Sequence, residues 1–286
     1  MRRVQHPALA LAELLLAACT GDRTVPEQPA GEPEQPPAEA EAAACLEGQR
    51  FVAAGSLPVE AAGPADAREI SSLRWSAHDA CERVVIDLAE EDGSPAQGTG
   101  AVEFEVLREL GVVRVALRGV ERVNPDATDG TFGGPLARAA YSVRSPDGRS
   151  TYVDVHLGAA AEAHVDALAG AARVVIDLRA GGAPIPAPPA SDTRMVVLEP
   201  RPGAASYPLT VTGYARTFEA NVVVRIEQDG TDLLETFTTA TAWLDAWGHF
   251  SLVIDDGPSG PIRLHVGEYS ARDGTWQGVS VELRMR

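Results

Sequence analysis

The sequence has no lysine, so arginine supplies all 24 basic side chains, against 41 acidic residues. The formal net charge is −17 at pH 7. A chain this acidic repels polyanions, and nucleic-acid binding needs a basic surface that neutralises phosphates. The composition therefore argues against a nucleic-acid partner.

Long apolar runs are also missing, because no stretch reaches the roughly 18 apolar residues that a membrane-spanning helix needs. The six histidines include no HxxxH or HExxH pair of the kind that zinc hydrolases use. A G-x-S-x-G nucleophile motif is absent too. We therefore predict no catalytic residue, no metal ligand and no cofactor. A glycosidase carboxylate pair that meets only in space stays a remote alternative.

Cysteine is scarce, with three in 286 residues. The first, Cys19, follows Arg2, Arg3 and an apolar run over residues 8–18 that ends in Leu-Ala-Ala. A basic start followed by an apolar run is typical of a secretory signal. The Cys directly after Leu-Ala-Ala resembles a bacterial lipoprotein signal. The resemblance implies that residues 1–18 are removed and that Cys19 carries the lipid anchor. The alternative is a buried helix with an ordinary cysteine.

The other two cysteines, Cys45 and Cys81, make an even number in a chain that is predicted to be exported. Disulfides persist outside the cytoplasm, so we predict a Cys45–Cys81 bridge. The alternative is two buried free thiols.

Two segments are rich in proline. Residues 19–44 are rich in Pro, Glu and Ala and cannot bury apolar surface, so we predict a disordered tether. Residues 181–193 (GGAPIPAPPASDT) predict a fairly stiff linker between two domains.

Between these segments lie short β-branched runs separated by Gly, Pro and Asp turns. The hexapeptide RVVIDL occurs twice, at residues 83–88 and 173–178. Residues 159–171 (AAAEAHVDALAGA) predict a short helix. Many short strands with close turns predict an all-β fold with a mostly antiparallel sandwich over residues 45–180.

The opening strand with Trp75 and RVVIDL, and the closing RVVIDL strand, resemble the AMIN-like domain of bacterial envelope proteins. This resemblance implies a β-sandwich that targets the envelope, in part by binding peptidoglycan.

Residues 194–286 hold about seven short strand candidates, a number typical of an immunoglobulin-like sandwich. A Pro-rich entry (Pro200, Pro202) and the pair Phe218-Glu219 resemble the Gmad2 immunoglobulin-like domain. Members of this family occur in exported bacterial proteins, some linked to spores and germination. The resemblance implies a binding or assembly module without catalysis.

Aromatic side chains are few, at 5% of the chain, and sugar rings stack on them. The candidate ligand-binding aromatics are Trp75, Trp243, Trp247 and Trp276. Trp243 and Trp247, four residues apart, could form an exposed edge; the alternative is that two or three of the four fill sandwich cores.

Together these patterns predict a lipid-anchored, non-enzymatic protein on the outer face of the bacterial cell membrane. Its predicted ligand is cell-wall polysaccharide (peptidoglycan) or an envelope protein complex. The alternative is a scaffold or regulator of a wall hydrolase, or of a germination-type assembly, that acts through protein contacts.

Overall fold

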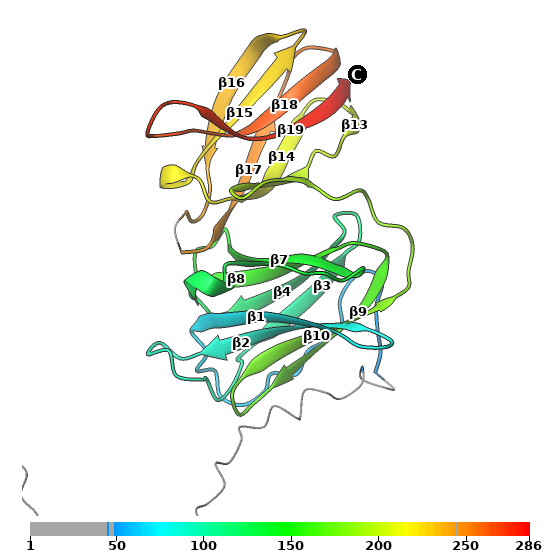
Figure 1. The fold of residues 1–286 in the computed structure, drawn as a ribbon, viewed down its shortest axis with the longest axis vertical. Helices are drawn as coiled ribbons and strands as arrows, with labels where there is room; N and C mark the ends of the chain where they lie inside the picture. The colour runs from blue at the N-terminus through cyan, green and yellow to red at the C-terminus, as the bar shows by residue number, and fades with distance from the viewer. Residues whose placement is uncertain (1–44, 46–48, 244) are drawn as a thin grey trace, which may run out of the picture. The chain divides into compact units, whose positions relative to one another are not determined.

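The computed structural model describes residue 45, residues 49–243 and residues 245–286, which belong to one compact unit (Figure 1). The predicted signal peptide, Cys19 and the tether over residues 19–44 lie outside the described residues. The described chain is all-β, as the sequence predicts. Its helical elements are two short 3₁₀ turns, Pro125–Ala127 and Phe218–Ala220.

The first sandwich packs a five-stranded sheet, sheet A (order β5-β1-β2-β10-β9), against one half of a nine-stranded sheet, sheet B. This half of sheet B holds β3, β4, β6, β7 and β8. Valine, isoleucine and leucine from both sheets alternate inward and fill the first core. The strands are β1 Glu69–Ala77, β2 Glu82–Ala89, β3 Val102–Leu107, β4 Val112–Arg118, β5 Arg122–Val123, β6 Asp129–Thr131, β7 Ala137–Arg144, β8 Ser150–Leu157, β9 Ala161–Leu168 and β10 Arg173–Ala180.

The two RVVIDL copies are β2 and β10, and they pair with each other in antiparallel register at the middle of sheet A. Because each copy begins with Arg and carries Asp at its fifth position, this register sets Arg opposite Asp at both ends. Arg83 donates from Nε and Nη2 to the two carboxylate oxygens of Asp177, at 2.7 and 2.8 Å. At the other end of the register, the Asp87 carboxylate accepts instead from Nε and Nη2 of Arg74 on β1, at 2.6 and 2.7 Å.

The predicted helix over residues 159–171 is wrong, because this segment forms strand β9 and pairs with β10. Its residues alternate, with Ala161, Ala163 and Val165 buried and His164 and Asp166 on the other face. Alanine has high helix propensity and hides this two-residue period. Tertiary pairing with a buried neighbour overrides the local preference.

The second sandwich packs sheet C (order β13-β19-β18-β15-β16) against the other half of sheet B, which holds β11, β12, β14 and β17. Its core is separate from the first. Asp229 and Gly230 both have positive φ, as a two-residue hairpin turn requires, and they join β15 to β16. The strands are β11 Ala190–Ser191, β12 Met195–Glu199, β13 Gly203–Ala205, β14 Leu209–Ala215, β15 Asn221–Gln228, β16 Thr231–Thr239, β17 Trp247–Ile254, β18 Gly260–Tyr269 and β19 Trp276–Met285.

Sheet B runs through both sandwiches, because β7 of the first pairs in parallel with β17 of the second. The predicted linker over residues 181–193 is also engaged on both sides. Ile185 packs against the first core, and Ala190–Ser191 forms β11 beside β12. The sandwiches are therefore joined by backbone pairing and by packing, not only by the connecting chain.

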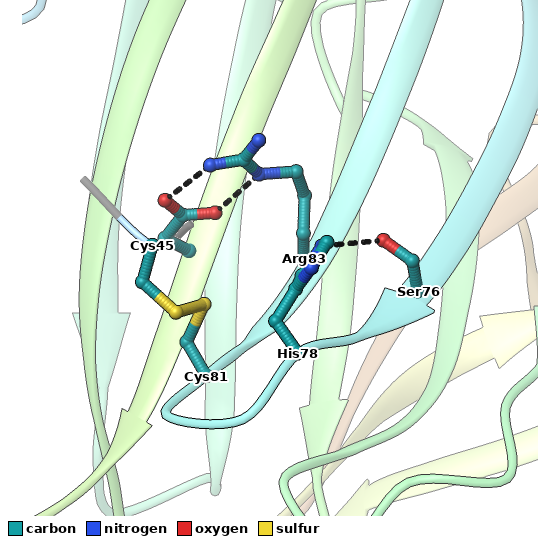
Figure 2. The surroundings of a disulfide bond; sticks show 6 residues. Cys45, Ser76, His78, Cys81 and Arg83 are labelled. Atoms are coloured by element: carbon teal, nitrogen blue, oxygen red, sulfur yellow. Dashed lines mark hydrogen bonds and ion pairs between the residues drawn. A yellow bond between two sulfur atoms is a disulfide. The ribbon is translucent and has the colours of Figure 1, made fainter. Parts of the chain in front are cut away.

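Cys45 and Cys81 form a disulfide, as predicted, with Cα atoms 5.9 Å apart (Figure 2). Cys81 immediately precedes β2 and is 4% exposed. Figure 2 shows the bridge beside Arg83, whose side chain reaches the buried Asp177 carboxylate. The bridge thus fixes the start of the described chain to the end of sheet A.

We expect a Cys45→Ala/Cys81→Ala variant to lose about 3–4 kcal/mol of unfolding free energy, because the bridge closes a loop of 36 residues in the unfolded chain. Denaturant unfolding with and without reductant measures the loss. Reductant should destabilise the natural chain to the same extent and leave the variant unchanged. Equal stability of both oxidised proteins would contradict this prediction.

Candidate binding surface

The four tryptophans lie in different places. Trp247 is 1% exposed and packs between the two sandwiches, so the expected exposed edge of Trp243 and Trp247 is wrong. β17 starts at Trp247 and pairs with β7, which turns this side chain inward. Trp243 packs partly on the second core and meets the ring of Phe218 edge to face, 5.5 Å between centroids.

Trp75, on β1, supports the first sandwich. Its indole Nε1 donates to Oε2 of Glu82 at 3.1 Å, and its ring stacks on Phe132 with centroids 6.2 Å apart. The buried Glu82 carboxylate also accepts from the backbone N–H groups of Leu136 and Ala137, at 2.8 Å each. Trp75 therefore belongs to a network that holds the chain before β7.

Trp276, on β19, lies in a cluster on the outer face of sheet C with Arg225 of β15 and Tyr269 of β18. The guanidinium carbon of Arg225 is 4.3 Å from the centroid of the Trp276 ring. The Tyr269 ring meets Trp276 edge to face at 5.3 Å. We call these three residues the aromatic–arginine cluster. Of the four predicted aromatics, Trp276 is the one that the structure places in such a cluster on an outer sheet face.

The cluster is bordered by charged side chains. The Tyr269 hydroxyl donates to Oε2 of Glu235 at 2.7 Å, and this bond raises the pKa of Tyr269. Arg225 donates to Asp232 at 3.2 Å. Beside them, His265 Nε2 lies 3.0 Å from a Glu227 carboxylate oxygen. The surface can stack on a planar or apolar group and can bond to polar groups around it.

Exposed apolar side chains gather on the same sandwich. Of six large ones in the described chain, five lie there, and only Leu168 belongs to the first sandwich. Three of the five, Leu233, Phe237 and Tyr269, lie on the outer face of sheet C, whereas Val253 lies on β17 of sheet B and Phe218 in a 3₁₀ turn. Exposed apolar groups that share one face mark interaction sites more often than scattered ones do. The five are Phe218, Leu233, Phe237, Val253 and Tyr269, at 40–71% exposure.

The sequence reasoning missed β16 as part of this surface. In TDLLETFTT, one face holds Leu233, Glu235 and Phe237, and the other holds Leu234 and two threonines. Hydrophobicity alone favours burying the face with Phe237, yet this ring is 71% exposed while Leu234 packs on the core. The adjacent pair Leu233-Leu234 could have indicated this, because neighbouring strand residues point to opposite faces and one of the two leucines must therefore lie on the outer face.

The arrangement of two facing sheets of short antiparallel strands is that of an immunoglobulin-like sandwich. Residues 194–275 match Gmad2, the immunoglobulin-like domain of bacterial spore germination. The strands β12 to β18 fall inside the matched residues, and β19 with Trp276 follows them. A comparison with curated proteins gave no match to this chain. The resemblance of residues 45–180 to the AMIN-like domain stays a prediction.

A buried polar cluster joins the Gmad2 domain to the first sandwich. Asp154 of β8 is fully buried and accepts from Nε and Nη2 of Arg114, each at 2.7 Å. Tyr214 of the Gmad2 domain, also fully buried, donates its hydroxyl to Asp154. Nearby, Trp247 Nε1 and Arg216 Nη1 donate to Asp129 of β6, at 2.9 and 3.2 Å.

Burial sets the ionisation of this cluster. Burial and the Asp154 charge raise the pKa of both Tyr214 and Tyr152, so the phenols stay protonated. Burial lowers the pKa of His156 to about 4, so the ring is neutral at pH 7. Asp154 and Tyr214 have no exposed surface, and the hydrogen bond between them links the two sandwiches.

Among the residues that the structure describes, no group of three or more His, Cys, Asp or Glu side chains could hold a metal ion. The same part of the chain has no helix long and apolar enough to cross a membrane.

We expect stability to fall as the pH drops from 7 to 5, in part through His156. In the unfolded chain this ring takes up a proton below its ordinary pKa of about 6.5, whereas the folded ring stays neutral down to about 4. The neutral ring thus contributes stability above pH 6.5 that is lost as the pH falls towards 4, about 2 kcal/mol at pH 5.

Unfolding of a His156→Gln variant between pH 5 and pH 7 measures this contribution, because the variant lacks the titrating ring. Its slope of stability against pH should be shallower than that of the natural chain. His78→Gln, in the turn after β1, is the matched control and should keep the natural slope. An unchanged slope in His156→Gln would mean that the ring titrates normally in the folded protein.

Proposed function

We propose that this chain is a non-enzymatic envelope protein, anchored by a lipid on Cys19, that binds a protein partner through the outer face of sheet C. The observation that carries the proposal is the aromatic–arginine cluster beside the exposed residues of β16. Aromatic and arginine side chains are enriched where interfaces derive most of their binding energy.

The disulfide and the Gmad2 domain fit a location outside the cytoplasm, where disulfides persist. The Gmad2 match also supports a role in protein–protein contact, because the family is named for spore germination and not for a catalytic activity. The proposed partner is therefore a protein of the envelope, such as a component of a germination-type assembly or a wall hydrolase that the chain scaffolds.

Direct binding to peptidoglycan is the second candidate, and Tyr269 with Trp276 favours it. Sugar rings stack on exposed aromatic faces, and Glu227, Glu235 and His265 could accept or donate hydrogen bonds to hydroxyl groups. In this case the AMIN-like resemblance of residues 45–180 would add a second contact with the wall.

Co-sedimentation of residues 43–286 with cell envelopes separates the two candidates. We expect the chain to pellet with envelopes that keep their proteins and to stay in solution with protein-free walls. Trp276→Ala should weaken pelleting about fivefold to thirtyfold, as loss of about 1–2 kcal/mol at an interface centre does. Leu168→Ala, an exposed apolar change on β9, is the control and should bind normally. Saturable pelleting with protein-free walls would instead identify peptidoglycan as the ligand.

The anchor is tested by the full-length chain with Cys19→Ala, expressed in a bacterium that processes lipoproteins. We expect the natural chain in the membrane fraction and the variant in the soluble extracytoplasmic fraction, because the chain would have lost its acyl groups. A variant that remains firmly bound to membranes would overturn the anchor.

A further inference from the structure

β16 ends sheet C and has one free side. It pairs with β15 along residues 231–239, and no other strand pairs with it within the described residues. On its other side, the Thr238 hydroxyl donates to the Ser251 carbonyl of β17 at 3.2 Å. The stretch before Thr238 therefore presents the unpaired backbone groups of an edge strand.

Natural edge strands are commonly protected against pairing by lysine, proline or charged side chains that point inward. β16 has no lysine or proline, and its inward residues are Leu234 and threonines. Its protection is limited to the acidic Asp232 and Glu235 and to a bulge at Leu233, where the register with β15 shifts. It also exposes Leu233 and Phe237, at 50% and 71%. An edge strand with two exposed large apolar side chains fits the addition of another strand.

The charge on this edge identifies the kind of strand. Glu235 lies between Leu233 and Phe237 on the same face, and the described partner of its carboxylate is the neutral Tyr269 hydroxyl. Arg225 lies directly opposite Glu235 on β15, but its guanidinium bonds to Asp232 and to the Tyr269 hydroxyl and stacks on the Trp276 ring. Arg263 is paired with Glu282. Glu235 is therefore a negative charge that a basic residue on an adjacent strand could neutralise.

The same charge argues against a second copy of this chain. A two-fold antiparallel pairing over the full length of β16 is centred on Glu235, its middle residue, and would set Glu235 opposite its own copy. Like charges directly opposite each other destabilise a strand pair. The net charge of −17 adds long-range repulsion between copies.

We propose that β16 accepts an extended segment of another polypeptide as an added strand of sheet C. On the face it shares with Leu233, Glu235 and Phe237, the segment carries an apolar, a basic and an apolar residue at alternate positions. Backbone hydrogen bonds to the free side of β16 supply affinity, and the three side-chain pairs supply register. This inference rests on the proposed function, because it names the chemistry of the protein partner.

The test uses residues 43–286 and two synthetic heptapeptides, Thr-Val-Thr-Lys-Thr-Val-Thr and the same sequence with Glu in place of Lys. We expect saturable binding of the lysine peptide, with binding of the glutamate peptide about tenfold weaker or less, as an opposite-charge pair and a like-charge pair would differ. Amide hydrogen exchange should slow in residues 231–237 and stay unchanged in β18.

A Glu235→Lys variant should reverse this preference and bind the glutamate peptide better. Glu109→Lys, which makes the same charge change in the exposed turn between β3 and β4, is the matched control and should keep the natural preference. The reversal would not follow from general charge attraction, because both variants change the net charge equally. Unchanged thermal unfolding of both variants shows that each is folded.

Three results would overturn the inference. One is the same preference in Glu235→Lys as in the natural chain, and another is protection outside β16. The third is dimers in sedimentation velocity that Glu235→Lys disrupts or strengthens, which would identify a second copy as the occupant. None of these would affect the proposed function, because the envelope experiment with Trp276→Ala tests a protein partner without assuming strand addition.

Discussion

The arrangement of the two sandwiches depends on the ion pair and the hydrogen bond that the buried Asp154 carboxylate makes with Arg114 and Tyr214. The carboxylate lies without solvent exposure where β8 of the first sandwich meets β14 of the second, and a buried charge needs full compensation. Arg114 supplies the opposite charge from the neighbouring strand β4, and Tyr214 supplies a hydrogen bond from the Gmad2 domain. Because the two sandwiches satisfy one charge together, separating them would expose or orphan it.

Around this charge, packing and backbone pairing act in the same direction. Trp247, Tyr214 and Tyr152 fill a third apolar cluster between the sandwiches, and β7 and β17 pair beside it. Sheet B is thus continuous across the boundary that the sequence marks with proline. The sandwich that carries the sheet C surface is therefore held against the first sandwich by direct contacts and not only by the linker.

Much of the fold was predictable from sequence, because short β-branched runs and Gly, Pro and Asp turns report strands directly. The two RVVIDL segments were recognisable as strands, and they pair with each other in sheet A. The even number of remaining cysteines predicted the disulfide. Strand β9 was misread since its alanines fit a helix as well as a strand. The local sequence pattern could not show that the Trp247 side chain is buried between the two sandwiches, because the residues it contacts are about a hundred positions away in the chain.

The binding surface was the least predictable part, for a related reason. Trp276 was named from its residue type, but Arg225, Glu235 and Tyr269 come together only through the register of β15, β16, β18 and β19. The hydrophobicity of Phe237 predicts a position in the core, so the sequence did not indicate that its ring is exposed. Which face of β16 turns outward is decided by its pairing with β15 and not by its composition.

The continuity of sheet B also determines how the protein would carry a mechanical load. If a partner on sheet C is pulled away from a membrane-held N-terminus, tension enters the described chain near the Cys45–Cys81 bridge and reaches the Gmad2 domain through the junction. The covalent bridge and the paired hexapeptides make the first sandwich the stiff end of this path. The β7–β17 pairing contributes two residue pairs to this junction, so the buried contacts of Asp154 and Trp247 would carry most of the load between the sandwiches.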